Sequence, residues 1–315
     1  MRKLVALDSE TLDLQQDEWS ALEQFGELVQ YPYTPYEEAI ILERCQGAEV
    51  VLSNKVPLME STLSQLPELK LVCILATGTN NVDLAAAERL GIAVKNVPAY
   101  STQAVAQHTL ALVLELTNRV GHYSQTVHAG DWVKNRQFCY WDHQIPELAG
   151  RTIGMIGFGQ IGRATAKVFN ALGMRVIANV RTPKDAPDWD GFEFVTREEV
   201  FEQADIISLH CPQTAENTGF VNKEILNRCK PGAILINTAR GPLINEQDLA
   251  DALESGQLAG AAIDVLTSEP MAADCPLLGA PNCVITPHHA WASVEARKRL
   301  MQVTFKNIQS TFNKE

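Results

Sequence analysis

Short apolar runs alternate with helical patterns through the first part of the chain. The runs are rich in β-branched residues and leucine, have the length of buried strands, and occupy residues 4–7, 50–52, 71–75 and 93–97. Between them, apolar positions recur at helical spacing over residues 18–25, 36–45, 59–66 and 84–90. This alternation predicts a parallel sheet covered by helices.

A second alternating series begins at residue 152. Its strand patterns lie near residues 152–156, 176–180, 206–209, 233–237, 260–264 and 284–286. Thr196 and Glu199 have the spacing of a capping box, and Asn245 with Asp248 predicts a similar helix start. The last helical pattern, residues 293–312, carries an apolar stripe, and we expect it to return to the first series.

A helical pattern over residues 102–127 and an aromatic, irregular segment separate the two series. The aromatic residues of this segment are Trp132, Phe138, Tyr140 and Trp141. Exposed aromatic side chains suit a protein interface, so residues 120–150 are predicted to form a dimer arm. The alternative, that these side chains pack under their own domain, stays open.

A glycine motif marks a candidate phosphate-binding turn, with the sequence Gly157-Phe158-Gly159-Gln160-Ile161-Gly162. It follows the predicted strand 152–156 and opens a predicted helix over residues 160–172. In this context Gly157 permits a tight turn, Gly159 lets a pyrophosphate approach the backbone, and Gly162 allows close helix packing. The amides of Gln160 and Ile161 begin the helix, whose N-terminus favours phosphate. The alternative is a glycine-rich turn that binds nothing.

The late position of this motif implies an inserted nucleotide domain, because a complete α/β series precedes it. The predicted fold is therefore α/β with two doubly wound parallel-sheet domains, in which a Rossmann domain is inserted into a flavodoxin-like substrate domain. Residues 1–100 and the C-terminal helix, residues 289–315, form the substrate domain. Residues 101–288 form the NAD(P)-binding domain.

Composition limits the possible binding partners and the cellular location. The net charge of −12 disfavours nucleic acid and anionic membranes as partners, and an anionic substrate needs a local cation. The seven cysteines are scattered and odd in number, which favours reduced thiols and a cytoplasmic location. No apolar signal region follows Met1, and the apolar stretch 104–116 is interrupted by Gln107 and His108 and is too short for a membrane span.

Three segments resemble the signatures of the D-isomer-specific 2-hydroxyacid dehydrogenases, namely Asn237-Thr238-Ala239-Arg240-Gly241, residues 264–270 (DVLTSEP) and Thr286-Pro287-His288-His289-Ala290. Residues 76–83, 138–142 and 289–293 are similar to the glycerate dehydrogenases, also called hydroxypyruvate reductases. With the glycine motif, the resemblance covers most of the chain. It implies reduction of a small 2-keto acid, hydroxypyruvate or glyoxylate, to the D-2-hydroxy acid with NAD(P)H, a homodimer, and no metal.

The resemblance also assigns catalytic roles. Hydride addition builds negative charge on the carbonyl oxygen, so a proton donor is needed there, and His288 matches the family's histidine. Glu269 matches the carboxylate that favours its imidazolium, and Arg240 matches the arginine that grips the substrate carboxylate. Each residue alone has a plain structural explanation. His289 is a neighbouring alternative, but side chains alternate along an extended strand, and the family pattern selects His288.

Further binding residues are implied less specifically. For the substrate they are the backbone of Gly78 and Thr79, with Asn54 on another loop. For the cofactor, Asp264 resembles the residue that holds the nicotinamide amide, and Cys211, Pro212 and Thr218 resemble the adenine-side wall. The remaining positions are Thr238, Ala239 and Ala290. Tight turns, strand-end capping and ordinary loop structure explain these residues equally well.

The predicted cofactor preference departs from the commonest family pattern. NAD-specific members carry an acidic residue at the end of the second Rossmann strand, where this chain has Val180 followed by Arg181. Without a carboxylate nothing repels a 2′-phosphate, and Arg181 offers it a charged hydrogen-bond donor, so NADP is favoured over NAD. The alternative is that Arg181 is a solvated loop cation and Asn179 alone meets the ribose.

Two other functions remain open. Nucleotide-sensing corepressors of transcription share the predicted fold and its signatures, although this chain lacks basic or low-complexity interaction segments. A relative acting on another 2-keto acid, on formate or on phosphite is the second alternative.

Overall fold

The computed structural model describes residues 1–183 and 185–312, and it divides the chain into two compact units. Met1–Ser101 and Ala292–Glu315 form the first unit, and Thr102–Trp291 form the second. The predicted two-domain α/β fold, with one domain inserted into the other, is confirmed. Residues 289–291 lie in the second unit instead of the first, because the amides of His289 and Ala290 donate to Asp264 there.

The first unit is built on a five-stranded sheet in the order β2-β1-β3-β4-β5. Its strands, all paired in parallel, are β1 (Lys3–Ala6), β2 (Glu27–Gln30), β3 (Val50–Ser53), β4 (Leu71–Ile74) and β5 (Ala93–Lys95). β1, β3 and β4 have almost entirely buried residues, as expected for strands covered on both faces. The strand order is flavodoxin-like, and it reverses direction between β1 and β3.

Helices and 3-10 turns cover this sheet. They are η1 (Ser9–Leu12), α1 (Gln16–Ser20), η2 (Ala21–Phe25), α2 (Glu38–Cys45), α3 (Glu60–Leu63), α4 (Leu84–Arg89) and α12 (Val294–Phe312). α12 packs on β4 and η2 through a buried stripe that repeats every four residues from Ala296 to Phe312. The single helix predicted over residues 18–25 starts two residues earlier, as α1, and it is wrong over residues 21–25, which form the 3-10 turn η2.

The second unit contains a seven-stranded parallel sheet in the order β12-β11-β10-β9-β6-β7-β8. Its strands are β6 (Thr152–Ile156), β7 (Arg175–Asn179), β8 (Glu193–Phe194), β9 (Ile206–Leu209), β10 (Ala233–Asn237), β11 (Leu258–Ile263) and β12 (Cys283–Ile285). Counted from β6, this is the Rossmann order with one further strand, and the reversal lies between β6 and β9.

Alternate residues of these strands face two separate cores. One face packs against α9 (Arg197–Gln203), α10 (Lys223–Leu226) and α11 (Glu246–Glu254), and the other packs against α5 (Thr102–Asn118) and α8 (Gln160–Ala171). The predicted helix starts are confirmed: Thr196 and Glu199 form a capping box for α9, and Asn245 caps α11. The 3-10 turns η3 (Ala215–Asn217) and η4 (Gly241–Leu243) complete the unit.

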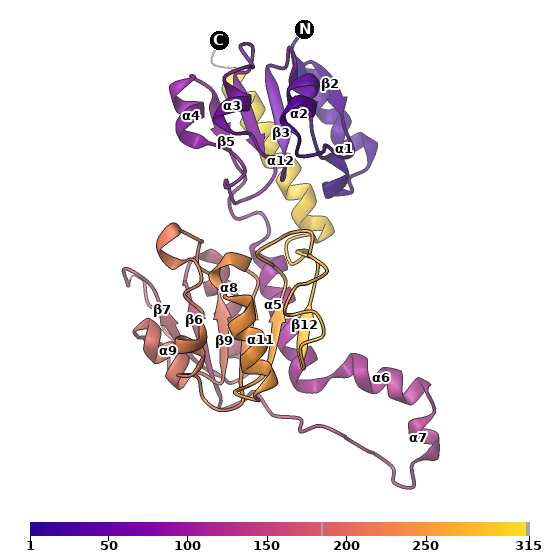
Figure 1. Ribbon diagram of the computed structural model, residues 1–315, viewed down its shortest axis with the longest axis vertical. Helices are drawn as coiled ribbons and strands as arrows, with labels where there is room; N and C mark the ends of the chain where they lie inside the picture. The colour runs from indigo at the N-terminus through magenta and orange to yellow at the C-terminus, as the bar shows by residue number, and fades with distance from the viewer. Residues whose placement is uncertain (184, 313–315) are drawn as a thin grey trace. The chain divides into compact units, whose positions relative to one another are not determined.

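An arm projects from the second unit at the end of α5 (Figure 1). The continuous helix predicted over residues 102–127 is wrong, because Arg119 adopts left-handed backbone with φ of 50° and separates α5 from α6 (Val120–His128). α7 (Asp131–Lys134) and an irregular segment follow. Every residue of α6 is at least partly exposed, and so are Trp132, Phe138 and Trp141. The alternative of aromatic side chains packed under their own domain is therefore wrong for these three residues.

Candidate functional site

The glycine turn lies where the strand order of the seven-stranded sheet reverses, between the ends of β6 and β9. Gly157 has a φ of +96°, and a side chain there would place its Cβ 2.6 Å from the His210 carbonyl carbon. A side chain at Gly162 would overlap the Gly157 carbonyl oxygen. Gly159, by contrast, faces open space among the described residues, with nothing within 4 Å of an added Cβ.

This arrangement fits the pyrophosphate of a dinucleotide. Gly159 is the N-cap of α8, and because it has no side chain it leaves the first-turn amides to an external acceptor. Gln160 and Ile161 begin the helix at the surface, and the positive end of the helix dipole faces the same opening. Gly157 and Gly162 allow the turn to close, while Gly159 allows a phosphate to reach the backbone.

The residues predicted around the ribose and adenine follow β7 and β9. Val180 is half-buried and packs on the core, whereas Arg181 is exposed. Asn179 donates its side-chain amide to the Val195 carbonyl at 3.1 Å, so one face of that amide is already engaged.

The loop after β9 carries the predicted adenine-side wall. Burial raises the pKa of the Cys211 thiol, and Pro212 is exposed beside it. The Thr218 hydroxyl donates to the Thr214 carbonyl at 2.9 Å and accepts from Gln213 at 2.8 Å. The structure therefore places these residues on one loop, which is closed by hydrogen bonds around η3.

His288 and Glu269 form a close pair. His288 Nδ1 lies 2.6 Å from Glu269 Oε2, and Glu269 Oε1 accepts from the Leu266 amide at 2.9 Å. Both side chains are partly exposed, at 21% and 34%. The carboxylate is thus held by the backbone while it engages Nδ1 of the imidazole, and Nε2 is the ring nitrogen outside this pair.

Arg240 follows β10, and its turn lies against the segment that holds Glu269. A side chain at Gly241 would overlap the backbone of Leu266, so the two loops touch main chain to main chain. Asn237 fixes the turn by donating to the Arg240 carbonyl at 2.9 Å. Arg240 Nη1 donates to the Ala239 carbonyl at 2.6 Å. The ends of β10 and β11 therefore bring the backbones of Arg240 and Glu269 to one edge of the sheet.

Two residues that are predicted to bind the cofactor, Thr238 and Ala239, are held in this turn by hydrogen-bond contacts. The Thr238 hydroxyl lies 3.3 Å from the hydroxyl of Thr109 on α5, and the Ala239 amide donates to Asn237 Oδ1 at 3.0 Å. Both residues are half-buried. The turn between β10 and η4 is therefore held in shape before any ligand binds.

Asp264 organises the loop that carries His288. Its side chain is 1% exposed, and it accepts from the Thr286 hydroxyl at 2.6 Å and from the amides of His289 and Ala290 at 3.0 Å. His288 has left-handed backbone with φ of 51°. The expectation that residues 288 and 289 alternate along an extended strand is therefore wrong, because β12 ends at Ile285 and Asp264 bends the chain beyond it.

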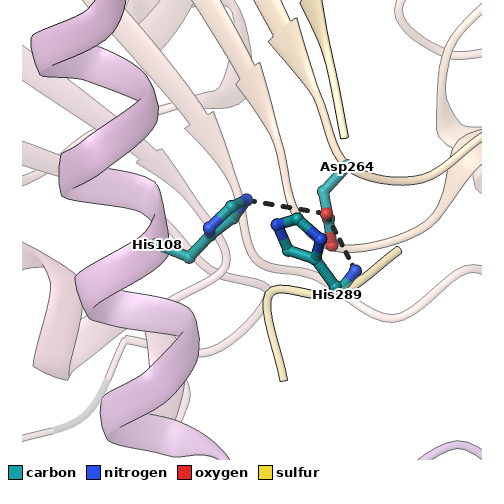
Figure 2. Close-up of side chains that lie close together, drawn as sticks. All are labelled: His108, Asp264 and His289. Carbon is teal, nitrogen blue, oxygen red and sulfur yellow. Dashed lines mark hydrogen bonds and ion pairs between the residues drawn. The ribbon is translucent and has the colours of Figure 1, made fainter. Parts of the chain in front are cut away.

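His108, which was predicted only to interrupt an apolar helical stretch, joins this cluster from α5 (Figure 2). Its Nε2 lies 3.1 Å from the Thr286 hydroxyl and 3.6 Å from Asp264 Oδ1. Burial lowers the pKa of His108, although the nearby Asp264 charge opposes that shift. A neutral ring donates from Nε2 to Thr286, whose own proton goes to Asp264. The ring of His289 meets the His108 ring edge-on, with centroids 4.8 Å apart.

The sequence pattern of the family described as D-isomer specific 2-hydroxyacid dehydrogenase, NAD binding domain, matches residues 110–290. The chain belongs to the D-isomer-specific 2-hydroxyacid dehydrogenases. The predicted resemblance is thus confirmed, and the seven-stranded unit is the NAD-binding domain of this dehydrogenase.

Relatives of this dehydrogenase match it over nearly its whole length. It is 43% identical to a hydroxypyruvate reductase of Blautia hydrogenotrophica, covering 98% of this chain and 96% of the relative. It is 41% identical to a glycerate dehydrogenase of Methylorubrum extorquens, with the same coverage. An NADPH-dependent glyoxylate/hydroxypyruvate reductase of Sinorhizobium meliloti, solved with NADP and malonate, has a TM-score of 0.85 at 27% identity, covering 99% of this chain and 93% of that one.

In the first unit of the dehydrogenase, the predicted substrate residues lie on loops at the carboxyl ends of β3 and β4. Asn54 is 4% exposed, and its amide donates to Asp8 Oδ1 at 2.9 Å. Its side-chain amide donates to Thr11 at 3.3 Å. Gly78 and Thr79 lie on a turn in which the Thr79 carbonyl accepts from the Val82 amide at 3.1 Å.

Asp8 was not predicted from the sequence, although it explains the position of Asn54. Both carboxylate oxygens are engaged by backbone amides, including that of Lys55 at 2.6 Å. Burial raises the pKa of Asp8, against the opposing effect of these hydrogen bonds. The loop after β3 is therefore held by a carboxylate of the protein itself.

Proposed function

We propose that this dehydrogenase reduces a small 2-keto acid, hydroxypyruvate or glyoxylate, to the D-2-hydroxy acid with NAD(P)H. The observation that carries the proposal is the pair of His288 and Glu269, 2.6 Å apart, on the sheet whose glycine turn fits a pyrophosphate. The names of the relatives, a hydroxypyruvate reductase and a glycerate dehydrogenase, support these substrates.

The residues have distinct roles in the proposed reaction. The reduced nicotinamide, when bound, supplies the hydride that adds to the keto carbon. His288 Nε2 gives a proton to the carbonyl oxygen as negative charge builds there. Glu269 accepts from Nδ1 and stabilises the imidazolium until that proton leaves. Arg240 binds the substrate carboxylate through its planar guanidinium, which supplies the local cation that an acidic protein needs.

A pair of variants tests this assignment. His288→Ala is expected to lower kcat for hydroxypyruvate at least about a hundredfold, the usual contribution of a positioned acid, while the nucleotide Kd stays the same. His289→Ala is the matched control and is expected to keep most of the turnover. Stopped-flow kinetics and fluorescence titration with nucleotide measure both quantities. The proposal fails if the wild type reduces neither keto acid, or if His289→Ala is the damaging change.

We further propose that NADPH is preferred over NADH. Val180 supplies no carboxylate to repel a 2′-phosphate, and the exposed Arg181 follows it directly. Asn179 is partly engaged with Val195, which weakens the alternative in which its amide alone meets the ribose. The reductase of Sinorhizobium meliloti, described as NADPH-dependent, offers a precedent for this choice in the same fold.

The preference is measured as kcat/KM with each reduced cofactor, in the wild type and in Arg181→Ala. We expect Arg181→Ala to lose about tenfold with NADPH and little with NADH, because it removes one charge-assisted contact to phosphate. A strong wild-type preference for NADH, or undiminished NADPH use by Arg181→Ala, contradicts the proposal.

We also propose a homodimer formed through the arm. Trp132, Phe138 and Trp141 expose 50%, 86% and 68% of their surface, which is typical of a contact with a second protein chain. We propose a cytoplasmic location, which the seven free cysteines support because disulfides are rare in that compartment. Among the described residues, no helix is long and apolar enough to cross a bilayer.

A further inference from the structure

The arm contains a polar network that fastens its irregular segment onto α6. The Tyr140 hydroxyl lies 2.6 Å from that of Thr126, and the Asp142 amide donates to the Tyr123 hydroxyl at 3.3 Å. His122, in the first turn of α6, adds a third contact through Asp142 Oδ2 at 2.7 Å. Contacts from one face of the helix therefore hold residues 140–142 in place.

His143 completes a compact group of three metal-ligating side chains in this network. Its Nδ1 lies 2.6 Å from Asp142 Oδ1, so two imidazole nitrogens address opposite oxygens of one carboxylate. One ligand atom from each of His122, Asp142 and His143 lies within 4.8 Å of the others. The two imidazole rings are nearly perpendicular, at 88°, and all three side chains are partly exposed.

We propose that His122, Asp142 and His143 form a binding site for a divalent transition metal such as Zn²⁺. Two imidazole nitrogens and one carboxylate are a ligand set that suits this class of ion, and a water takes the fourth position. Ca²⁺ and Mg²⁺ are not expected to bind, because they require more oxygen ligands than one carboxylate offers. Nothing in this site depends on the proposed reductase activity, since the residues lie on the arm and not at the glycine turn.

The required rearrangement is small. Ligands at about 2.0–2.1 Å from a tetrahedral Zn²⁺ lie about 3.3 Å from one another. The nitrogen–oxygen distances of 2.7 Å and 2.6 Å, which end on different oxygens of Asp142, are shorter than this separation, and rotation of the exposed side chains must open them. On binding, His122 Nε2 and His143 Nδ1 give up the protons that they now donate to the carboxylate, and these protons pass to the other ring nitrogens or to water.

Binding would have a structural consequence for the arm. His122 belongs to α6, whereas Asp142 and His143 belong to the segment that returns from α7. A metal bound to all three would cross-link these two parts of the arm. We therefore expect the metal to protect the returning segment from proteases.

The test uses the full-length protein after chelator treatment, without nucleotide. Isothermal titration with Zn²⁺ at pH 7.5 is expected to show one site per chain, and Co²⁺ is expected to give the absorption bands of tetrahedral coordination. His122→Ala and His143→Ala should each weaken binding at least about tenfold. His128→Ala, an exposed histidine on the same helix, is the matched control and should bind like the wild type. Thermal unfolding checks that each variant folds.

Limited proteolysis supplies a second readout that does not rely on affinity. Zn²⁺ should slow cleavage in the arm of the wild type and of His128→Ala, but not in His122→Ala. The proposal is overturned if no Zn²⁺ binds, or if binding survives in both His122→Ala and His143→Ala. It is also overturned if His108→Ala abolishes the binding, because the metal then occupies the His108, Asp264 and His289 cluster.

Discussion

The two sheets of this dehydrogenase reverse their strand order in the same way, but they treat the reversal point differently. In the first unit the order reverses between β1 and β3, and the carboxylate of Asp8 fills the space by accepting from the amides of Asn54 and Lys55. In the second unit it reverses between β6 and β9, where Gly159 leaves the space open. The first reversal point is filled by a carboxylate of the protein, whereas the second leaves its backbone amides for a ligand.

The difference shows that backbone geometry alone does not make a binding site. Loops and helix N-termini that follow parallel strands present backbone N–H groups, and those groups need acceptors wherever they are buried. Asp8 satisfies them in the first unit, and Asp264 does the same for the amides of His289 and Ala290 in the second. Gly159 offers no such acceptor, so the N-terminus of α8 is the place where an external anion is expected.

Gly159→Asp is expected to place a carboxylate at the second reversal point, as Asp8 does at the first. A carboxylate at the N-cap would accept from the first-turn amides of α8 and repel a pyrophosphate. We expect the nucleotide Kd to rise at least about a hundredfold, while unfolding stability stays the same or rises by roughly a few tenths of a kcal/mol. Fluorescence titration and denaturant unfolding measure the two effects. Gly159→Ala, whose methyl group meets open space, separates the charge from the side chain; equal losses in both variants would contradict the idea.

Asp8→Ala tests whether the carboxylate at the first reversal point stabilises the first unit. It leaves the amides of Asn54, Lys55 and Val56 without their acceptor, at an expected cost of about 3 kcal/mol in the unfolding free energy of the first unit. Asp8→Asn keeps an acceptor oxygen without a buried charge and should lose less. Urea unfolding is followed by tryptophan fluorescence, to which the first unit contributes through the buried Trp19. The nucleotide Kd should not change in either variant, and an unperturbed unfolding curve for Asp8→Ala would remove the proposed role.

The sequence predicted the strands that are buried on both faces, because continuous apolar runs are distinctive. It missed β2 and β8, which are edge strands of four and two residues with little burial. The break at Arg119 was also missed, since left-handed backbone at a non-glycine residue has no strong local signal.

The parts of the site that follow a sequence motif could be predicted. The parts that depend on contacts between residues far apart in the sequence could not. The glycine turn and the pair of His288 and Glu269 each follow from a recognisable pattern of residues. Asp8 and His108 do not, because their partners lie far away in the sequence: Asn54 is 46 residues from Asp8, and Thr286 is 178 residues from His108. A lone aspartate after a strand, or a histidine in a helix, gives no sign of such a partner.

His108→Ala tests whether the cluster around Asp264 positions the loop that carries His288. Losing the donor to Thr286 should loosen the loop that carries His288 and lower kcat about tenfold, the cost of one buried hydrogen bond. His108→Gln keeps a donor and should recover part of the rate, and Gln107→Ala, an exposed neighbour on α5, is the control. Steady-state kinetics with hydroxypyruvate separate kcat from KM. If His108→Ala changes only the melting temperature, the residue is structural and does not position the loop.

The two reversal points also carry titratable groups whose pKa values shift in opposite directions, with opposite effects on stability. Burial lowers the pKa of His210, in the loop that contacts Gly157, to about 4. An unfolded histidine has a pKa of about 6.5, so the unfolded state takes up the proton first and stability falls as the pH drops from about 6.5 towards 4. The raised pKa of Asp8 acts in reverse, because the folded state is then protonated first.

The acid sensitivity from His210 is the smallest of the expected effects. Between pH 7.5 and 5.5 it should cost about 1 kcal/mol of unfolding free energy, since most of the uptake by the unfolded state is complete at the lower value. His210→Asn has no proton to take up and retains a polar group next to Ser208, 2.9 Å from the ring in the wild type. Its unfolding free energy should therefore depend less on pH by that amount, while His128→Ala, at the surface, should follow the wild type. Parallel curves for His210→Asn and the wild type would show that the histidine beside the glycine turn is not held neutral by burial.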